Sequence, residues 1–153
     1  MPAVYGVVAD GSGGERLPWS WAVEQLTAAR NYWICTTRAD GRPHAMPVWG
    51  VWLDGAVWFS THPGSTKGRN MARDPRVVVH LESGDDTVVL EGTVEHPTDR
   101  GALERFADAY EQKYGHRIEL PMREPSIYVL SPRVAHTWTE SDFPRTATRW
   151  VFD

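Results

Sequence analysis

The stretch DGRPHAMPVWGVWLDGAVWFST, residues 40–61, decides the predicted fold. It holds two Asp-Gly pairs, which are typical of tight turns between antiparallel strands. The first pair precedes a long strand predicted over His44–Leu53, and the second turns the chain into a strand predicted over Ala56–Thr61. Together with a strand pattern at Asn31–Arg38, this stretch predicts three antiparallel strands in an open meander.

Both faces of the predicted His44–Leu53 strand are largely apolar. One face carries Ala45, Pro47, Trp49, Val51 and Leu53. The other carries His44, Met46, Val48, Gly50 and Trp52. A strand on the wet surface of a monomer would alternate apolar with polar residues. We therefore expect one face to fill a barrel and a second subunit to cover the other.

The rest of the chain adds two long helical patterns and further strands. We expect a helix that Ser20 caps and that ends near Arg30, and a second helix over Arg100–Tyr114 that ends at Gly115. Gly92 predicts a bulge or a sharp bend, as barrel closure requires. The further strands are predicted at Val77–Glu82, Thr87–Glu95, Ser126–Leu130, Val134–Thr139 and Thr146–Phe152. Antiparallel strands without βαβ alternation predict a β-barrel with helical plugs.

Composition limits the class of protein. The chain has 153 residues, which suits one domain, and its net charge of −4 argues against a general nucleic-acid binder. We expect residues 1–16 to form a flexible arm and residues 17–153 to form the domain. There is no long apolar run and no signal-peptide pattern, so we expect a cytoplasmic protein.

Metal and thiol chemistry find little support in the sequence. Cys35 is the only cysteine, which excludes an intrachain disulfide and a cysteine-based zinc site. No two of the six histidines have the spacing of a metal-binding pair, so we predict no metal site. Catalytic carboxylate or nucleophile motifs are also missing. If the protein is an enzyme, we expect a cofactor to carry the chemistry.

One loop carries the residue types of an anion site. The segment Gly64–Asn70 combines two hydroxyls, a lysine, an arginine and two glycines, and it opens a short helix towards Arg73. Hydroxyls, cations and the amides of a helix N-terminus together bind phosphate. A solvated basic turn would have the same spacing, and the residues alone leave both interpretations open. The many strand tryptophans suggest either a flat ligand or a large apolar interface.

These segments resemble a known family. The stretch at residues 40–61, followed by STKGRNMARDPRVVVHLE at 65–82 and VVLEGTVE at 88–95, resembles the split β-barrel flavin and deazaflavin oxidoreductases of the pyridoxamine 5′-phosphate oxidase-like superfamily. The resemblance extends over about residues 19–152. The run from Lys67 to Arg76 and the ending AHTW…ATRWVF look closest to the actinobacterial branch that uses coenzyme F420.

The resemblance implies a fold, a cofactor and a set of contacts. It implies a mainly β (α+β) fold, a six- to seven-stranded antiparallel split β-barrel with two or three helices, and a homodimer with the cofactor at the subunit interface. Phosphate contacts are implied for Ser65, Thr66, Lys67, Arg69 and Asn70. Ring contacts are implied for Met46, Pro47, Val48, Trp49, Ser60 and Thr61. Trp138, Arg149 and Trp150 are implied to approach the same cleft, from the same or the partner chain.

Three functions are compatible with this sequence. The first is an F420-dependent reductase that passes a hydride to an apolar, conjugated small molecule. The second keeps the fold but binds FMN, as a flavin reductase or oxidase. The third is a cofactor carrier without turnover. The basic residues that pyridoxamine 5′-phosphate oxidase itself uses for the phosphates of FMN and substrate have no match here, which argues against vitamin B6 oxidation.

Overall fold

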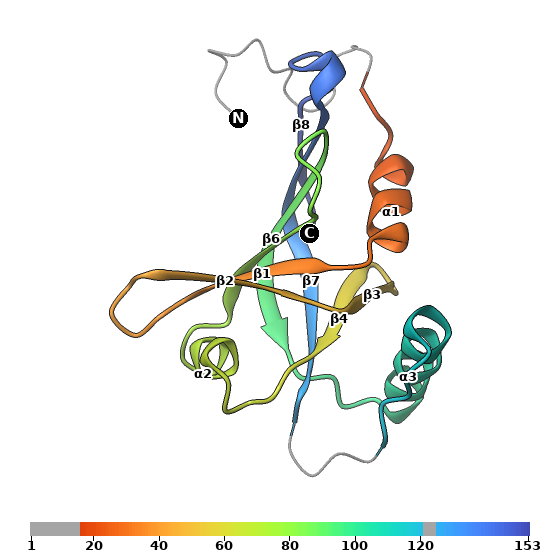
Figure 1. The fold of residues 1–153 in the computed structure, drawn as a ribbon. Helices are drawn as coiled ribbons and strands as arrows, with labels where there is room; N and C mark the ends of the chain where they lie inside the picture. Colours follow the sequence, from red (N-terminus) through yellow and green to blue (C-terminus); the bar gives the residue numbers. More distant parts are fainter. Residues whose placement is uncertain (1–15, 121–124) are drawn as a thin grey trace.

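The structure is a computed structural model that describes residues 16–120 and 125–153 (Figure 1). Its helices are α1 (Trp19–Ala28), α2 (Thr66–Arg73) and α3 (Arg100–Tyr114), with a 3₁₀ turn at Glu140–Asp142. Its strands are β1 (Tyr32–Thr37), β2 (Pro43–Val48), β3 (Gly50–Leu53), β4 (Ala56–Ser60), β5 (Arg76–His80), β6 (Asp86–Glu95), β7 (Ile127–Thr139) and β8 (Thr148–Val151). All but Arg16 of the arm predicted for residues 1–16 lies outside the described residues.

The strands form one antiparallel sheet that curls into a split barrel. The strand order is β2-β1-β5-β6-β7-β4-β3, and β8 pairs with β7. Strands β2 and β3 lie at opposite ends of this order, yet only Trp49 separates them in the chain. The sheet must therefore bend round until its two ends meet. The predicted α+β split barrel is confirmed. The two hairpins of the predicted meander are present, because β1 pairs with β2 and β3 pairs with β4. The meander is not open, since β1 also pairs with β5 and β4 with β7.

The strands differ from the predicted ones in two places, apart from shifts of one or two residues at strand ends. The expected strand His44–Leu53 is broken at Trp49, because Gly50 leaves the ladder of β1 and its amide takes Tyr114 Oη as acceptor at 3.0 Å. The expected strands Ser126–Leu130 and Val134–Thr139 form one strand, β7. Pro132 does not break β7, since it faces Gly92 at a shift of register in the β6–β7 ladder.

That shift of register confirms the bulge predicted at Gly92. A Cβ atom there would lie 2.5 Å from the backbone oxygen of Ser131, so only glycine permits this approach of β6 to β7. Bulges of this kind increase the local bend of a strand. The bulge therefore lies where β6 and β7 curve.

The helices follow the sequence closely, with one exception. Helix α3 has the predicted bounds; Asp99 caps it by accepting from the amide of Ala102 at 2.8 Å, and Gly115 ends it with a φ of 71°. Helix α1 begins at Trp19, so Ser20 lies inside its first turn and makes no capping bond. The predicted Ser20 cap is wrong for that reason. No described helix combines the length and hydropathy needed to cross a bilayer.

The core has two parts. The larger part fills the barrel with fully buried side chains of the sheet and of α1, including Leu26, Tyr32, Ile34, Phe59, Leu90 and Leu130. The smaller part lies between α3 and the β3–β4 hairpin, where Phe106 stacks on Trp58 at 5.6 Å. Val48 of β2 packs against the larger part and Val51 of β3 belongs to the smaller one, so the β2–β3 junction lies where the two parts meet.

Candidate functional site

The loop before α2 is a tight, self-bonded turn. Ser65 Oγ donates to the carbonyl of His62 at 2.7 Å and accepts from the amide of Gly68 at 3.1 Å, so Ser65 is the cap of α2. A Cβ atom on Gly68 would lie 2.6 Å from the backbone oxygens of His62 and Pro63. Gly68 therefore lets the loop close against the first turn of the helix. The short helix predicted from this segment is confirmed.

The predicted phosphate contacts fall into two groups. Arg69 donates to the carbonyl of Gly64 at 2.9 Å, and the buried Asn70 donates to Thr36 Oγ1 at 3.0 Å. These two side chains hold the loop and the helix in place. Lys67 instead makes no hydrogen bond or ion pair within the described residues. Thr66 and Lys67 form the first turn of α2, where backbone amides point out of the helix end.

The β2 strand lies next to this helix. Thr36 of β1, which bonds to Asn70 of α2, pairs with His44 of β2. Side chains two apart on a strand share a face, so Met46 and Val48 lie on the same face as His44. Met46 is 47% exposed although it is apolar. An exposed apolar strand thus runs beside the cationic turn of α2, as a ring with a phosphate tail requires.

The other predicted ring contacts, Pro47, Trp49, Ser60 and Thr61, do not lie together. Pro47 pairs with Trp33 and lies on the opposite face from Met46. Trp49 stacks on Tyr114 of α3 with 4.5 Å between ring centroids, and the guanidinium of Arg30 lies 5.2 Å from its ring. Ser60 ends β4 and Thr61 follows it directly before the loop, where the hydroxyl of Thr61 lies 3.4 Å from Ser65 Oγ.

The C-terminal candidates lie away from α2. Strand β8 pairs with residues 134–137 of β7, at the end of the β6–β7 ladder far from α2 (Figure 1). Trp150 packs on Trp19 and donates to Thr137 Oγ1 at 2.9 Å, whereas Arg149 lies on the opposite face of β8. Trp138 shares the face of Arg149 and contacts Phe143. One chain alone does not bring these three residues to the loop.

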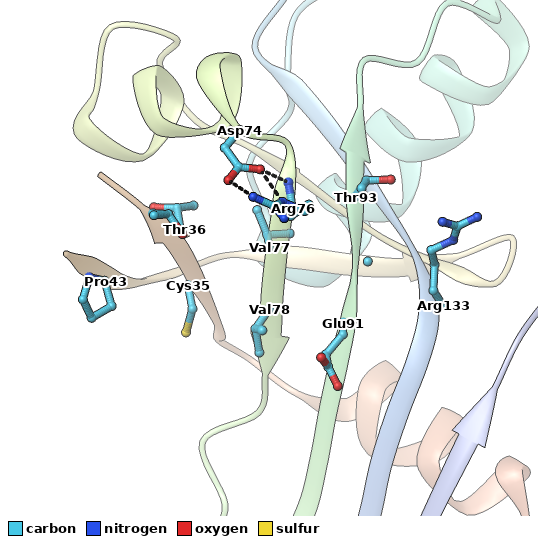
Figure 2. A pocket seen from close by; sticks show the side chains of 12 residues that line it. Cys35, Thr36, Pro43, Asp74, Arg76, Val77, Val78, Glu91, Thr93 and Arg133 are labelled. Carbon is cyan, nitrogen blue, oxygen red and sulfur yellow. Dashed lines mark hydrogen bonds and ion pairs between the residues drawn. The ribbon is translucent and has the colours of Figure 1, made fainter. Parts of the chain in front are cut away.

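The outer face of the sheet carries a shallow cavity of about 590 Å³ (Figure 2). Its floor includes Cys35, Val78 and Glu91, which are neighbours in register on β1, β5 and β6. At one edge the Arg76 guanidinium bonds to both carboxylate oxygens of Asp74, which lowers the pKa of Asp74 to about 2. Burial raises the pKa of the Cys35 thiol, so it stays protonated at neutral pH and supplies no nucleophile.

One residue of the site region, His44, was not predicted from the sequence to belong to the site. His44 is buried beside α2, and burial followed by the charges of Arg38 and Lys67 lowers its pKa. The sequence places His44 on the same strand face as Met46, but its burial depends on the helix that covers this face. Strand alternation, which places it two residues before Met46, was the signal that could have found it. No group of three metal-ligating side chains occurs within residues 16–120 and 125–153.

Comparison with known proteins agrees with this fold. The family model described as pyridoxamine 5′-phosphate oxidase matches residues 21–139. The chain belongs to this family. Its members are oxidoreductases of the split-barrel type that bind flavins or deazaflavins. The match begins in α1 and ends at the last residue of β7, so it includes the loop, β2 and both edges of the barrel. No curated protein sequence matches the chain.

Solved structures of this fold are similar to the chain. One is the conserved hypothetical protein Rv2991 from Mycobacterium tuberculosis, with 25% identity and a TM-score of 0.69 over 80% of this chain and 85% of that one. Another is an F420 reductase, with 21% identity and a TM-score of 0.55 over 73% and 93% of the two chains. A third is a heme binding protein from Mycobacterium smegmatis, with 21% identity and a TM-score of 0.68 over 89% and 59%. The last two show similarity of fold alone.

Proposed function

We propose that the protein is an F420-dependent reductase, which transfers a hydride between the deazaflavin coenzyme and an apolar, conjugated small molecule. The observation that carries the proposal is the unpaired Lys67 at the open end of α2, beside the exposed apolar strand β2. A phosphate-bearing tricyclic ring has the same two parts, an anion and a flat apolar body. The similarity of fold to an F420 reductase supports this choice.

The chain's residues fit such a group. The Lys67 ammonium and the first amides of α2 would hold its phosphate, while Ser65, Arg69 and Asn70 keep the loop closed. Met46 and Val48 would lie along the ring and exclude water from one of its sides. When bound, the cofactor supplies the hydride chemistry, and the protein supplies orientation and a dry surface.

The proposal includes a homodimer. Pro47, Trp33, His80, Val89, His136 and Arg149 follow one another in register across the outer face of the sheet. No helix among the described residues packs on this face, because α1, α2 and α3 contribute to the other side of the sheet or to the β3–β4 hairpin. A second copy would cover these aromatic and apolar groups. It would also bring its own Trp138 and Arg149 towards the loop, which one chain cannot do.

FMN is the second candidate cofactor, because the family model that matches the chain is that of pyridoxamine 5′-phosphate oxidase. Titration of the purified protein with F420 and FMN side by side tests both. We expect the absorbance of F420 to shift on binding, and preferential binding of FMN would favour a flavin reductase or oxidase. Binding of F420 without reoxidation of its reduced form, over a panel of quinones and enones, would favour a carrier.

Two variants connect the titration to the site. Lys67→Ala should weaken cofactor binding at least tenfold, or about 1.4 kcal/mol. Arg100→Ala removes the same charge from the exposed start of α3 and should leave binding unchanged. Equal affinity of the Lys67→Ala variant and the wild type would remove Lys67 from the site, and binding of neither cofactor would refute the proposed function.

A further inference from the structure

Three basic side chains, those of Arg38, His44 and Lys67, lie close enough beside α2 to interact electrostatically. Thr36 of β1 pairs with His44 of β2, and Arg38 directly follows β1, where its amide donates to the carbonyl of Arg42 at 3.0 Å. Helix α2 packs on this hairpin through the bond from Asn70 to Thr36. Lys67 lies three residues before Asn70, which places the two on one side of the helix. The charges of Arg38 and Lys67 both act on His44.

Two nitrogens of this cluster lack partners. His44 is 8% exposed, and its Nδ1 is buried without a hydrogen bond within the described residues. The Nε of Arg38 is also buried without a partner there. Buried polar atoms without partners are rare in folded proteins, and each one marks a place where a partner is missing. The Nε of Arg38 can only donate, and the Nδ1 of His44 donates whenever it carries a proton, so a single acceptor can serve both atoms.

The charges around His44 indicate that this acceptor is an anion. The two charges that act on His44, from the end of β1 and from α2, are both positive. The nearby acid of the hairpin turn, Asp40, is exposed and already bonds to Arg42 through both carboxylate oxygens. Because His44 faces cations and is desolvated, its pKa is lowered and it is neutral in the free chain. An anion bound among the three side chains would raise the pKa of His44 and favour its protonated form.

We propose that Arg38, His44 and Lys67 form one site for a phosphate ester, and that binding of the ester places a proton from solvent on His44. Both nitrogens are buried in the free chain, so the proposal requires the two side chains to turn towards the ester on binding. The inference rests on the proposed function in that the ester is the one carried by the cofactor. It goes beyond that function because it adds two ligands and couples binding to proton uptake.

Calorimetry measures the coupling directly. We would titrate the protein with F420 and with FMN at pH 7.5, in two buffers that differ in their enthalpy of ionisation. The difference in heat gives the number of protons taken up, and we expect about one per bound ester. His44→Asn keeps a side-chain donor but cannot titrate, so it should reduce the uptake to near zero. His116→Asn changes an exposed histidine after α3 and should leave the uptake as in the wild type.

The pH dependence gives a second measurement. In the wild type, affinity should fall as pH rises through the pKa of His44 in the complex, because the bound form loses its proton. In His44→Asn, affinity should not depend on pH over the same range. If that variant does not fold, Arg38→Gln replaces it, and we expect at least a tenfold loss of affinity together with a reduced proton uptake.

The outcomes separate this inference from the proposed function. Cofactor binding without proton uptake, and with the same affinity in His44→Asn, would overturn the inference and leave the function standing. If neither cofactor binds, inorganic phosphate is the probe. Stabilisation of the fold by phosphate in the wild type, lost in His44→Asn and in Lys67→Ala, would support the site while the proposed function fails. Equal stabilisation of all three proteins would overturn the site as well.

Discussion

Gly68→Ala tests how closely the fold of the α2 loop and cofactor binding are connected. The added Cβ would lie 2.6 Å from two backbone oxygens, those of His62 and Pro63. An ordinary carbon–oxygen contact is more than half an ångström longer, and neither oxygen can move alone because both belong to the backbone of the loop. The loop must therefore shift as a unit or tilt α2. Overpacking of this kind costs about 1–3 kcal/mol.

The expected effect has two readouts. For a domain of this size, 1 kcal/mol lowers Tm by about 2–4 °C, so we expect thermal unfolding of Gly68→Ala to begin several degrees earlier. Cofactor affinity should fall at least tenfold, since the shifted loop no longer presents Lys67 and the α2 amides together. Gly84→Ala is the control, because a Cβ atom there meets nothing within 4 Å. Wild-type Tm and affinity in Gly68→Ala would refute the close packing of the loop.

Three further predictions follow from other parts of the molecule. Phe106→Ala removes a fully buried ring that stacks on Trp58 and should lower the free energy of unfolding by about 3–5 kcal/mol, measured by urea denaturation; an unchanged midpoint would contradict the α3 core. Burial lowers the pKa of Lys113 to about 8, so between pH 8 and the pKa of an unfolded lysine near 10.4 the unfolded chain holds more protons, and wild-type stability should rise with pH relative to Lys113→Met. A flat difference between the two curves would show that Lys113 is not desolvated. Val78→Glu places a charge in the middle of the outer sheet face and should yield monomers in light scattering, with loss of cofactor binding; a dimeric variant would place the interface elsewhere.

Local chemistry made much of the fold predictable. The bounds of α3 follow from its helical periodicity, with Gly115 at its end. The Asp-Gly turns gave the hairpins, and Gly92 gave the bulge. The helix bounds and the hairpins depend on residues within a few positions of one another, and the bulge was predicted from a single glycine. The pairing of the remaining strands is different, because the pairs β1–β5 and β4–β7 join residues far apart in the chain and no local pattern predicted them.

In the candidate site, too, some features follow from local sequence and others depend on residues distant in the chain. The cap at Ser65 and the open turn of α2 follow from the order of residues in the loop. Nothing in that order shows that Arg69 and Asn70 bond to the protein itself, because their partners are the carbonyl of Gly64 and the hydroxyl of Thr36. Burial of His44 was invisible for the same reason, since it depends on which helix covers the β1–β2 hairpin.

The most direct test of the account is a crystal structure of the protein with F420 bound. We predict a dimer in which the phosphate contacts Lys67 and the first amides of α2, the ring lies along Met46 and Val48, and the partner copy supplies Trp138 and Arg149. A ring bound away from β2, or a phosphate that does not reach Lys67, would contradict the account.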